Sequence, residues 1–214
     1  MSTWFITGCS SGLGRALAEA AISAGHSVVA TARDVSTVAD LADAHPQQVL
    51  AVAVDVTRTD QVVDAVLQAT HRFGGVDVLV NNAGYGYRAA VEGLSGSLRG
   101  ELAPLGISVT IVEPGAFRTD FAGRSLTQSA TAIDDYADTA GKRRKEHDTM
   151  HGTQAGDPAK AATAIIAAVE SDNPPGFLLL GSDALALHRQ VADARAAEVA
   201  AWESVTVGTD YTEG

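Results

Sequence analysis

The chain has 214 residues, of which 46% are apolar and 19% are charged, a balance typical of a globular protein rather than a disordered one. Its 15 basic and 26 acidic residues give a formal charge of −11, which argues against nucleic acid and anionic membranes as partners. The single cysteine excludes an intramolecular disulfide framework. The sequence has no apolar run approaching about 20 residues and no leader pattern, so we expect a cytoplasmic protein.

Apolar runs alternate with helical patterns through the first eighty residues. We expect strands over residues 4–7, 27–32, 49–54 and 76–80, and helices over 15–23, 38–44 and 59–73. On the last of these helices, the side chains expected to face inward are Val62, Val63, Val66 and Ala69. Near-continuous apolar strands alternating with helices are typical of a parallel sheet covered on both faces. The pattern predicts one doubly wound α/β domain spanning residues 1–214.

The second half of the chain continues this alternation less regularly. We expect helices over 89–102, 158–169 and 185–202, and strands over 107–112 and 177–181. Asp157 should cap the helix that starts at Pro158. The predicted strand order is 3-2-1-4 followed by the two late strands, with helix 89–102 as a parallel crossover. Residues 121–156 lack a clear period, and we interpret them as a flexible lid segment.

Three glycines, Gly8, Gly12 and Gly14, lie between the first strand and the first helix. Glycine permits a tight turn there, lets backbone N–H groups approach a pyrophosphate, and lets the helix pack closely on the strand. The positive end of the helix then faces the phosphates. In this strand–turn–helix context, the spacing favours a dinucleotide phosphate site over an ordinary tight turn.

Further polar positions follow the second, third and fourth strands. Arg33 stands where other dinucleotide sites carry an acid for the ribose, so a cation there favours a 2′-phosphate and hence NADP(H) over NAD(H). Asp55 and Val56 close the third strand, where the adenine would lie, and Asn82 follows the fourth. These positions share the carboxyl ends of the strands, where open α/β sheets bind ligands.

Taken in order, four motifs resemble the short-chain dehydrogenase/reductase family: Thr7-Gly8-x-x-x-Gly12-x-Gly14, Asp55-Val56, Asn81-Asn82-Ala83-Gly84 and Pro114-Gly115-x-x-x-Thr119. Segments 113–121 and 178–184 resemble its 17β-hydroxysteroid-dehydrogenase-like subgroup. The resemblance implies a Rossmann-like fold and NAD(P)-dependent hydride transfer with a small carbonyl or secondary-alcohol substrate. It implies that the cofactor is bound by Gly8, Ser10, Ser11, Gly12, Leu13, Gly14, Arg33, Asp55, Val56, Asn82, Ala83, Gly84, Pro114, Gly115 and Thr119.

The family's catalytic Ser and Tyr-x-x-x-Lys pair have no counterpart in this sequence. None of the four tyrosines is followed by Lys four residues later. The simplest account is an internal deletion that removes one helix, the strand carrying the Ser, and the first part of the Tyr-Lys helix. The fold would then be one strand and about one and a half helices short, and no catalytic residue is assigned. The family's usual dimer surface lies in the same region, which leaves the oligomeric state open.

Other candidate groups have simpler explanations. Tyr85 or Tyr87 could serve as a substitute acid beside Arg88, but aromatic side chains covering a sheet edge are the simpler interpretation. His147 and His151 do not by themselves make a metal site, and the cluster 142–145 reads as part of a solvated lid. Cys9 lies near a helix N-terminus, which can lower a thiol pKa, but a small turn residue is the safer interpretation.

Three functional hypotheses remain open from the sequence. The first is a member of this family whose dehydrogenase activity is lost or impaired. The second is a non-catalytic NADP(H)-binding or regulatory module, and the third is a non-functional truncated product.

Overall fold

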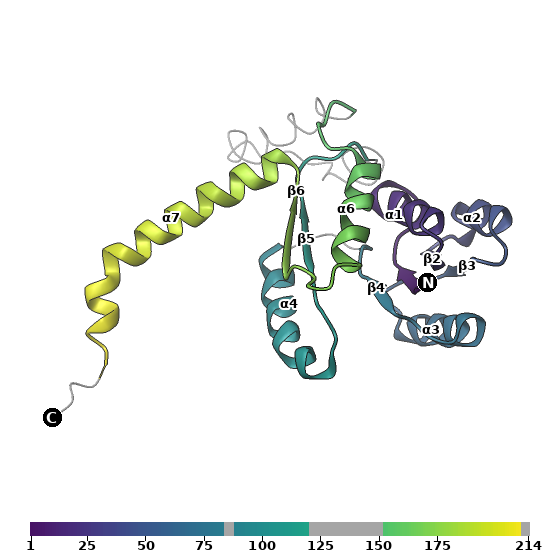
Figure 1. The fold of residues 1–214 in the computed structure, drawn as a ribbon, viewed down its shortest axis with the longest axis horizontal. Helices are drawn as coiled ribbons and strands as arrows, with labels where there is room; N and C mark the ends of the chain where they lie inside the picture. The colour runs from purple at the N-terminus through teal and green to yellow at the C-terminus, as the bar shows by residue number, and fades with distance from the viewer. Residues whose placement is uncertain (84–87, 120–151, 211–214) are drawn as a thin grey trace, which may run out of the picture.

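The computed structural model describes residues 1–83, 88–119 and 152–210 (Figure 1). The strands are β1 (Thr3–Ile6), β2 (Ser27–Ala32), β3 (Val49–Ala53), β4 (Val78–Val80), β5 (Ile111–Pro114) and β6 (Phe177–Leu180). The α-helices are α1 (Gly12–Ser23), α2 (Ala39–Ala44), α3 (Thr59–Phe73), α4 (Arg88–Leu102), α6 (Pro158–Val169) and α7 (Ser182–Val207). Two short 3-10 helices are η1 (Val35–Thr37) and η2 (Ala103–Leu105). The chain therefore has the alternating α/β architecture that the sequence predicts.

Strands β1 to β4 form a parallel sheet in the order β3-β2-β1-β4. Trp4 of β1 pairs with Val28 on one side and with Val78 on the other. Every residue of β1 and β2 is buried, as expected for apolar central strands with cover on both faces. The predicted order of the first four strands is confirmed.

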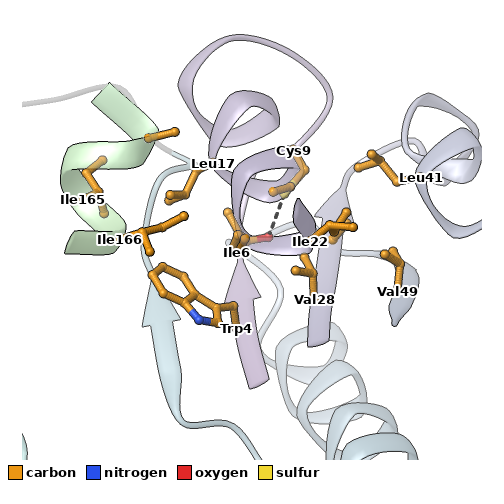
Figure 2. Close-up of a cluster of buried hydrophobic side chains, with 14 of the residues drawn as sticks. Trp4, Ile6, Cys9, Leu17, Ile22, Val28, Leu41, Val49, Ile165 and Ile166 are labelled. Carbon is orange, nitrogen blue, oxygen red and sulfur yellow. Dashed lines mark hydrogen bonds between the residues drawn. The ribbon is translucent and has the colours of Figure 1, made fainter. Parts of the chain in front are cut away.

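Alternate residues of β1 face opposite sides of this sheet and join two separate clusters. Trp4 and Ile6 belong to a cluster with Leu17 of α1 and with Ile165 and Ile166 of α6 (Figure 2). Phe5 packs on the other side, where Ala65 and Ala69 of α3 are buried. The sheet is thus a central layer between α1 with α6 on one face and α3 on the other.

Helix α6 is fixed at its start as the sequence predicts. The Asp157 carboxylate accepts a hydrogen bond from the Ala159 backbone N–H at 2.9 Å, and Pro158 occupies the first turn. The N-cap and the proline together set where α6 begins. Its apolar side then lies against α1, where Ala161 and Ala162 are buried.

Strands β5 and β6 form a separate two-stranded parallel sheet, so the predicted continuation of one sheet from β4 to β5 is wrong. Helix α4 carries the chain from β4 toward β5, but these two strands are not paired (Figure 1). Both sheets instead pack beneath α6: Leu180 of β6 is buried in the same cluster, and Val80 and Val112 pack against it. A shared helix can cover the apolar surface of two sheets without joining their backbone edges.

One flank of α3 is uncovered, which corrects a second expectation. Val63 and Val66 were predicted to face inward, but their side chains are 54% and 43% exposed, while Ala65 and Ala69 are fully buried. Leu79, in the middle of β4, is 60% exposed. Within the described residues nothing covers this flank, so apolar groups that a parallel sheet normally buries face solvent.

The last helices lie mainly outside the core. Helix α4 matches its predicted range closely and is largely exposed, whereas α7 extends beyond its predicted range at both ends. Figure 1 shows α7 leaving the body of the molecule. No helix in the described ranges is long and apolar enough to cross a membrane. The expected lid segment falls almost entirely on residues 120–151, outside the described residues.

Candidate functional site at the carboxyl ends of the strands

The turn between β1 and α1 depends on glycine at three positions. Gly8 and Gly12 have φ angles of +74° and +64°, a region that side chains with a Cβ rarely adopt. Gly14 has no such angle, but a Cβ on it would lie 2.4 Å from both the Gly8 carbonyl oxygen and the Asn82 Nδ2 atom. The turn is therefore packed tightly enough that only glycine fits at Gly14.

Asn82 and Thr7 fasten this turn to the end of β4. The Asn82 side-chain amide donates hydrogen bonds to the carbonyl oxygens of Thr7 and Gly8, at 2.9 and 3.1 Å. The Thr7 hydroxyl accepts the backbone N–H groups of Asn82 and Ala83, both at 2.9 Å, and donates to the Val80 carbonyl at 3.2 Å. These bonds fix the conformation of the turn from the neighbouring strand.

The N-terminus of α1 opens on the same turn. Ser11 is the N-cap and its side chain makes no capping hydrogen bond, and the first turn of the helix holds no acidic residue. Ser10 is exposed and Leu13 packs partly against the core, so the turn has one solvent-facing and one inward-facing side. A helix N-terminus with no side-chain cap and no acidic residue in its first turn is electrostatically suited to an anion.

Cys9 lies inside this turn as a buried structural residue. Its side chain is fully buried, its backbone N–H donates to the Thr31 carbonyl at 2.8 Å, and its Sγ atom donates to the Ile6 carbonyl at 3.2 Å (Figure 2). Burial raises the pKa of the Cys9 thiol to about 12, outweighing the opposing effects of the Thr31 backbone and the Arg15 charge. The simpler interpretation from the sequence is therefore correct, and an activated thiol is not.

Arg33 and Asp55 lie at the ends of the next two strands. Arg33 is exposed and forms no ion pair with any residue that the structure describes. Asp55 Oδ1 accepts the Thr57 backbone N–H and hydroxyl, at 3.0 and 2.7 Å. These bonds, with a smaller contribution from the Arg33 charge, hold the pKa of Asp55 below its usual range. Val56, beside them, is 44% exposed, so this edge offers an exposed cation, a carboxylate and an apolar side chain.

The segment after β5 reaches back to the glycine turn. A Cβ on Gly12 would lie 3.3 Å from the Thr119 Cβ atom, so the residue that ends Pro114-Gly115-x-x-x-Thr119 contacts the first turn. The Gly115 backbone N–H donates to the Leu180 carbonyl at 2.8 Å, which ties the segment to β6. The two ends of the predicted site are therefore side by side.

Asp183 and Arg118 were not assigned a role from the sequence, yet they hold this segment in place. The Asp183 carboxylate accepts the Ala116 backbone N–H at 2.7 Å, and Arg118 Nε donates to the Gln154 carbonyl at 2.6 Å. A Cβ on Gly115 would overlap the Asp183 carboxylate. The only signal in the sequence was the Gly-Ser-Asp run that follows the last strand.

The structure thus brings together the predicted positions at the ends of β1 to β5, with one exception. Gly84 lies outside the described residues, as do Tyr85, Tyr87, the cluster 142–145, His147 and His151. Arg88 begins α4. In the part of the chain that the structure describes, no group of three or more His, Cys, Asp or Glu residues could hold a metal ion.

Comparisons with known proteins assign this arrangement to a family. A family profile described as short chain dehydrogenase matches residues 2–89. The oxidoreductase BOA17 of Botryotinia fuckeliana is 30% identical over 270 aligned positions, covering 96% of this chain and 98% of the relative. A crystal structure of a short-chain dehydrogenase from Streptomyces avermitilis is 33% identical, with a TM-score of 0.86 over 98% of this chain and 99% of that chain. A short-chain dehydrogenase/reductase from Burkholderia phymatum, solved in complex with NAD, shares the fold at 19% identity and a TM-score of 0.72, over 100% and 97% of the two chains.

The fold and the glycine turn define a Rossmann-like α/β protein. With these relatives, the chain belongs to the short-chain dehydrogenase/reductase family, whose members bind a nicotinamide dinucleotide. The 270 positions aligned with BOA17 exceed the 214 residues of this chain, so the relative holds residues that have no counterpart here.

Proposed function

We propose that this chain binds NADP(H) across the carboxyl ends of β1 to β5 and that its dehydrogenase activity is lost or severely impaired. The observation that carries the proposal is the intact glycine turn, fastened by Asn82, in a sequence that has no Tyr-x-x-x-Lys pair. The chain retains the groups that hold a dinucleotide and lacks the groups that would move a proton to or from a substrate oxygen.

The pyrophosphate would occupy the turn at the start of α1. Backbone N–H groups at Gly12 and Leu13 belong to the first turn of the helix and have no partner further back in it. Together with the helix dipole they favour a bridging phosphate. Thr119, in contact with Gly12, would close the turn over the cofactor from the side of β5.

The adenosine end would lie over β2 and β3. A 2′-phosphate there would meet the Arg33 guanidinium, which has no competing ion pair among the described residues. Asp55 and Val56 would lie against the adenine. NADP(H) is favoured over NAD(H) on the charge of Arg33 alone, while the related structure from Burkholderia phymatum holds NAD.

The nicotinamide end would lie beside Pro114 to Thr119. The proton donor that hydride transfer requires is lacking at this end. When bound, the cofactor would supply or accept a hydride at its nicotinamide ring. Hydride transfer to a carbonyl also needs an acid for the developing alkoxide, and the sequence provides no tyrosine activated by a lysine one helical turn away. Without that acid, the loss in rate is about 10²–10⁴-fold.

An internal deletion accounts for the missing acid. Strands β4 and β5 do not pair with each other, which leaves room for a further strand between them. A further helix would cover the exposed side chain of Leu79 and the uncovered flank of α3. The longer alignment with BOA17 supports the same account. We also place the chain in the 17β-hydroxysteroid-dehydrogenase-like subgroup, on the sequence of segments 113–121 and 178–184.

Thermal melts of the purified protein alone, with NADPH and with NADH test cofactor binding. A ligand that binds only the folded state raises the midpoint with its concentration, so we expect a larger shift with NADPH than with NADH. An Arg33→Asp variant should lose most of the NADPH shift and little of the NADH shift. An equal loss for both would contradict the NADP(H) assignment, and no shift with either would contradict cofactor binding.

Turnover is tested separately. With aldehyde and ketone substrates, under conditions that saturate binding, we expect NADPH oxidation to be at least about 10²-fold slower than in a typical dehydrogenase. Turnover at a rate typical of a dehydrogenase, about 1–10³ s⁻¹, would show that another group supplies the proton.

A further inference from the structure

Helix α7 lacks a partner along nearly its whole length. It has 26 residues and is therefore about 39 Å long, yet Ala184 is its one buried residue. Figure 1 shows it projecting from the body, and no other element that the structure describes covers its outer turns. Isolated helices are marginal in water and usually depend on an apolar face packed against something else. Several of its residues, such as Val199 and Trp202, are also poor helix formers.

Seven large apolar side chains of α7 are exposed, and four of them lie along one side of the helix, while Leu185, Val199 and Val207 point in other directions. At 100° per residue, six exposed positions fall within a sector of about 80° and form one stripe along the helix. These stripe residues are Leu187, Val191, Arg195, Glu198, Trp202 and Val205. The four apolar members have exposed fractions between 50% and 65%. The remaining charged residues of the outer turns, Arg189, Asp193 and Glu203, lie off this stripe.

The stripe is complementary to itself when its direction is reversed, because the apolar residues meet apolar residues and the cation meets the anion. Two apolar residues are followed by a cation, an anion and two apolar residues, at spacings of four, four, three, four and three. A second copy of the helix laid antiparallel, centred between residues 196 and 197, would place Val191 beside Trp202 and Leu187 beside Val205. It would also place Arg195 beside Glu198, twice, because a two-fold interface repeats each contact.

We propose that α7 is a dimer interface, at which it pairs antiparallel with α7 of a second copy of this chain. Charge complementarity favours a second copy of α7 as the partner and the antiparallel over the parallel direction. A parallel, in-register pair would set Arg195 against Arg195 and Glu198 against Glu198, and like charges at close range are destabilising. The antiparallel pair satisfies both charges and covers the four apolar side chains of the stripe, which the other described residues of the same chain leave exposed.

The oligomeric state in solution tests the pairing. Sedimentation equilibrium of the full chain in about 0.15 M salt limits repulsion between two chains of charge −11. We expect the wild type to form a dimer. Arg195→Glu and Glu198→Arg should each weaken the dimer about tenfold or more, since each creates two like-charge contacts. Arg189→Glu makes the same charge change off the stripe and should leave the dimer unaltered.

Mixing the two stripe variants separates intermolecular contacts from effects within one helix. In a mixed dimer, the two stripe carboxylates of the Arg195→Glu copy would face the two stripe guanidinium groups of the Glu198→Arg copy. Association should therefore return to about the wild-type level. The charge pairs within each helix are unchanged by mixing. Circular dichroism of each variant alone checks that the helix still forms.

Two results would overturn the proposal. One is a wild-type chain that stays monomeric throughout the accessible concentration range. The other is a dimer that neither stripe variant weakens, or that weakens without recovery on mixing, because the interface would then lie elsewhere. The α7 interface does not require cofactor binding. The NADPH melt, run on the wild type and on the variants, therefore tests cofactor binding separately from dimer formation.

Discussion

The N-terminal region, residues 1–83, and the C-terminal region, residues 88–119 and 152–210, differ sharply in how well their elements are covered. Every residue of β1 and β2 is buried, whereas Leu180 is the one buried residue in β5 and β6. Helix α1 packs against the sheet and against α6 on the same face, while α4 and α7 are largely exposed. The N-terminal region therefore holds most of the stabilising apolar contacts.

The glycine turn is therefore held by the better covered of the two regions. The bonds that fix the turn come from Thr7, Asn82 and Ala83, all in the N-terminal region. The uncovered surfaces, such as the Leu79 side chain and the flank of α3 with Val63 and Val66, take no part in these bonds. The conformation of the turn is thus set within the N-terminal region, and changes in the two regions should have different effects.

The largest effect we expect is protection of Cys9, the one cysteine in the chain. Burial raises its pKa from 9.0 to about 12, which lowers the thiolate fraction at neutral pH about a thousandfold. Reaction with an alkylating reagent should be slower by at least that factor than in urea-unfolded protein. NADPH should slow it further, since opening of the turn competes with binding. Native labelling as fast as unfolded labelling would mean that the turn is open in solution.

Two leucine truncations compare the regions directly. Leu17 of α1 is 1% exposed, and Leu94 of α4 is 71% exposed. Leu17→Ala should lower the free energy of unfolding by about 2–5 kcal/mol because it leaves a cavity in the core. Leu94→Ala should change it by no more than about 0.5 kcal/mol. Urea denaturation measures both, and a comparable loss for the two variants would show that α4 is covered in solution.

Two glycine substitutions make the same comparison at the level of the backbone. A Cβ on Gly14 would lie 2.4 Å from the Gly8 carbonyl, whereas a Cβ on Gly93 of α4 meets nothing within 4 Å. Gly14→Ala should cost about 1–3 kcal/mol through overpacking and should abolish the NADPH-dependent shift. Gly93→Ala should stabilise by about 0.5–1 kcal/mol through helix propensity. A tolerated Gly14→Ala with normal cofactor binding would contradict the close packing at the turn.

The glycine turn could be predicted from the sequence because its determinants are local. Three glycines within seven residues, preceded by an apolar strand, already specify the turn, and the order of β1 to β4 follows from regular strand–helix alternation. The N-cap at Asp157 is local in the same way. Elements of this kind were predicted within a few residues of their observed ends.

The errors concern contacts between distant parts of the chain. Apolar periodicity on α3 could not distinguish the face with Ala65 and Ala69 from the adjacent flank with Val63 and Val66, because only the neighbouring elements decide which side is covered. The separation of β5 from β4 was not predicted either, and in the structure Val80 and Val112 pack against the cluster that contains α6 instead of sharing one sheet. The contact of Asp183 with Ala116 spans 67 residues, and the Gly-Ser-Asp run that contains Asp183 does not indicate which distant residue it meets.

The smallest effect concerns the ion pair between α1 and α2, which tests whether the N-terminal region is held by charge as well as by apolar contacts. Arg15 Nη1 donates to Asp40 Oδ1 at 2.9 Å, and Nη2 donates to Oδ2. This contact lowers the pKa of Asp40 and raises that of Arg15. Because the folded-state pKa of Asp40 is depressed, its stabilisation is fully present above the unfolded value of about 4 and is lost as pH falls through the folded value.

Asp40→Asn should therefore lower stability at neutral pH, with the two stability curves converging as the pH falls through the depressed folded-state pKa of Asp40. The difference should be small, since Asp40 is 63% exposed and Glu19 also pairs with Arg15. Asp43→Asn is the matched control, because Asp43 is on the same helix and has no ion-pair partner in the described residues. Thermal melts from pH 2 to 7 measure both variants. Parallel curves for Asp40→Asn and wild type would mean that the carboxylate contributes nothing, and that apolar packing alone holds α2 against α1.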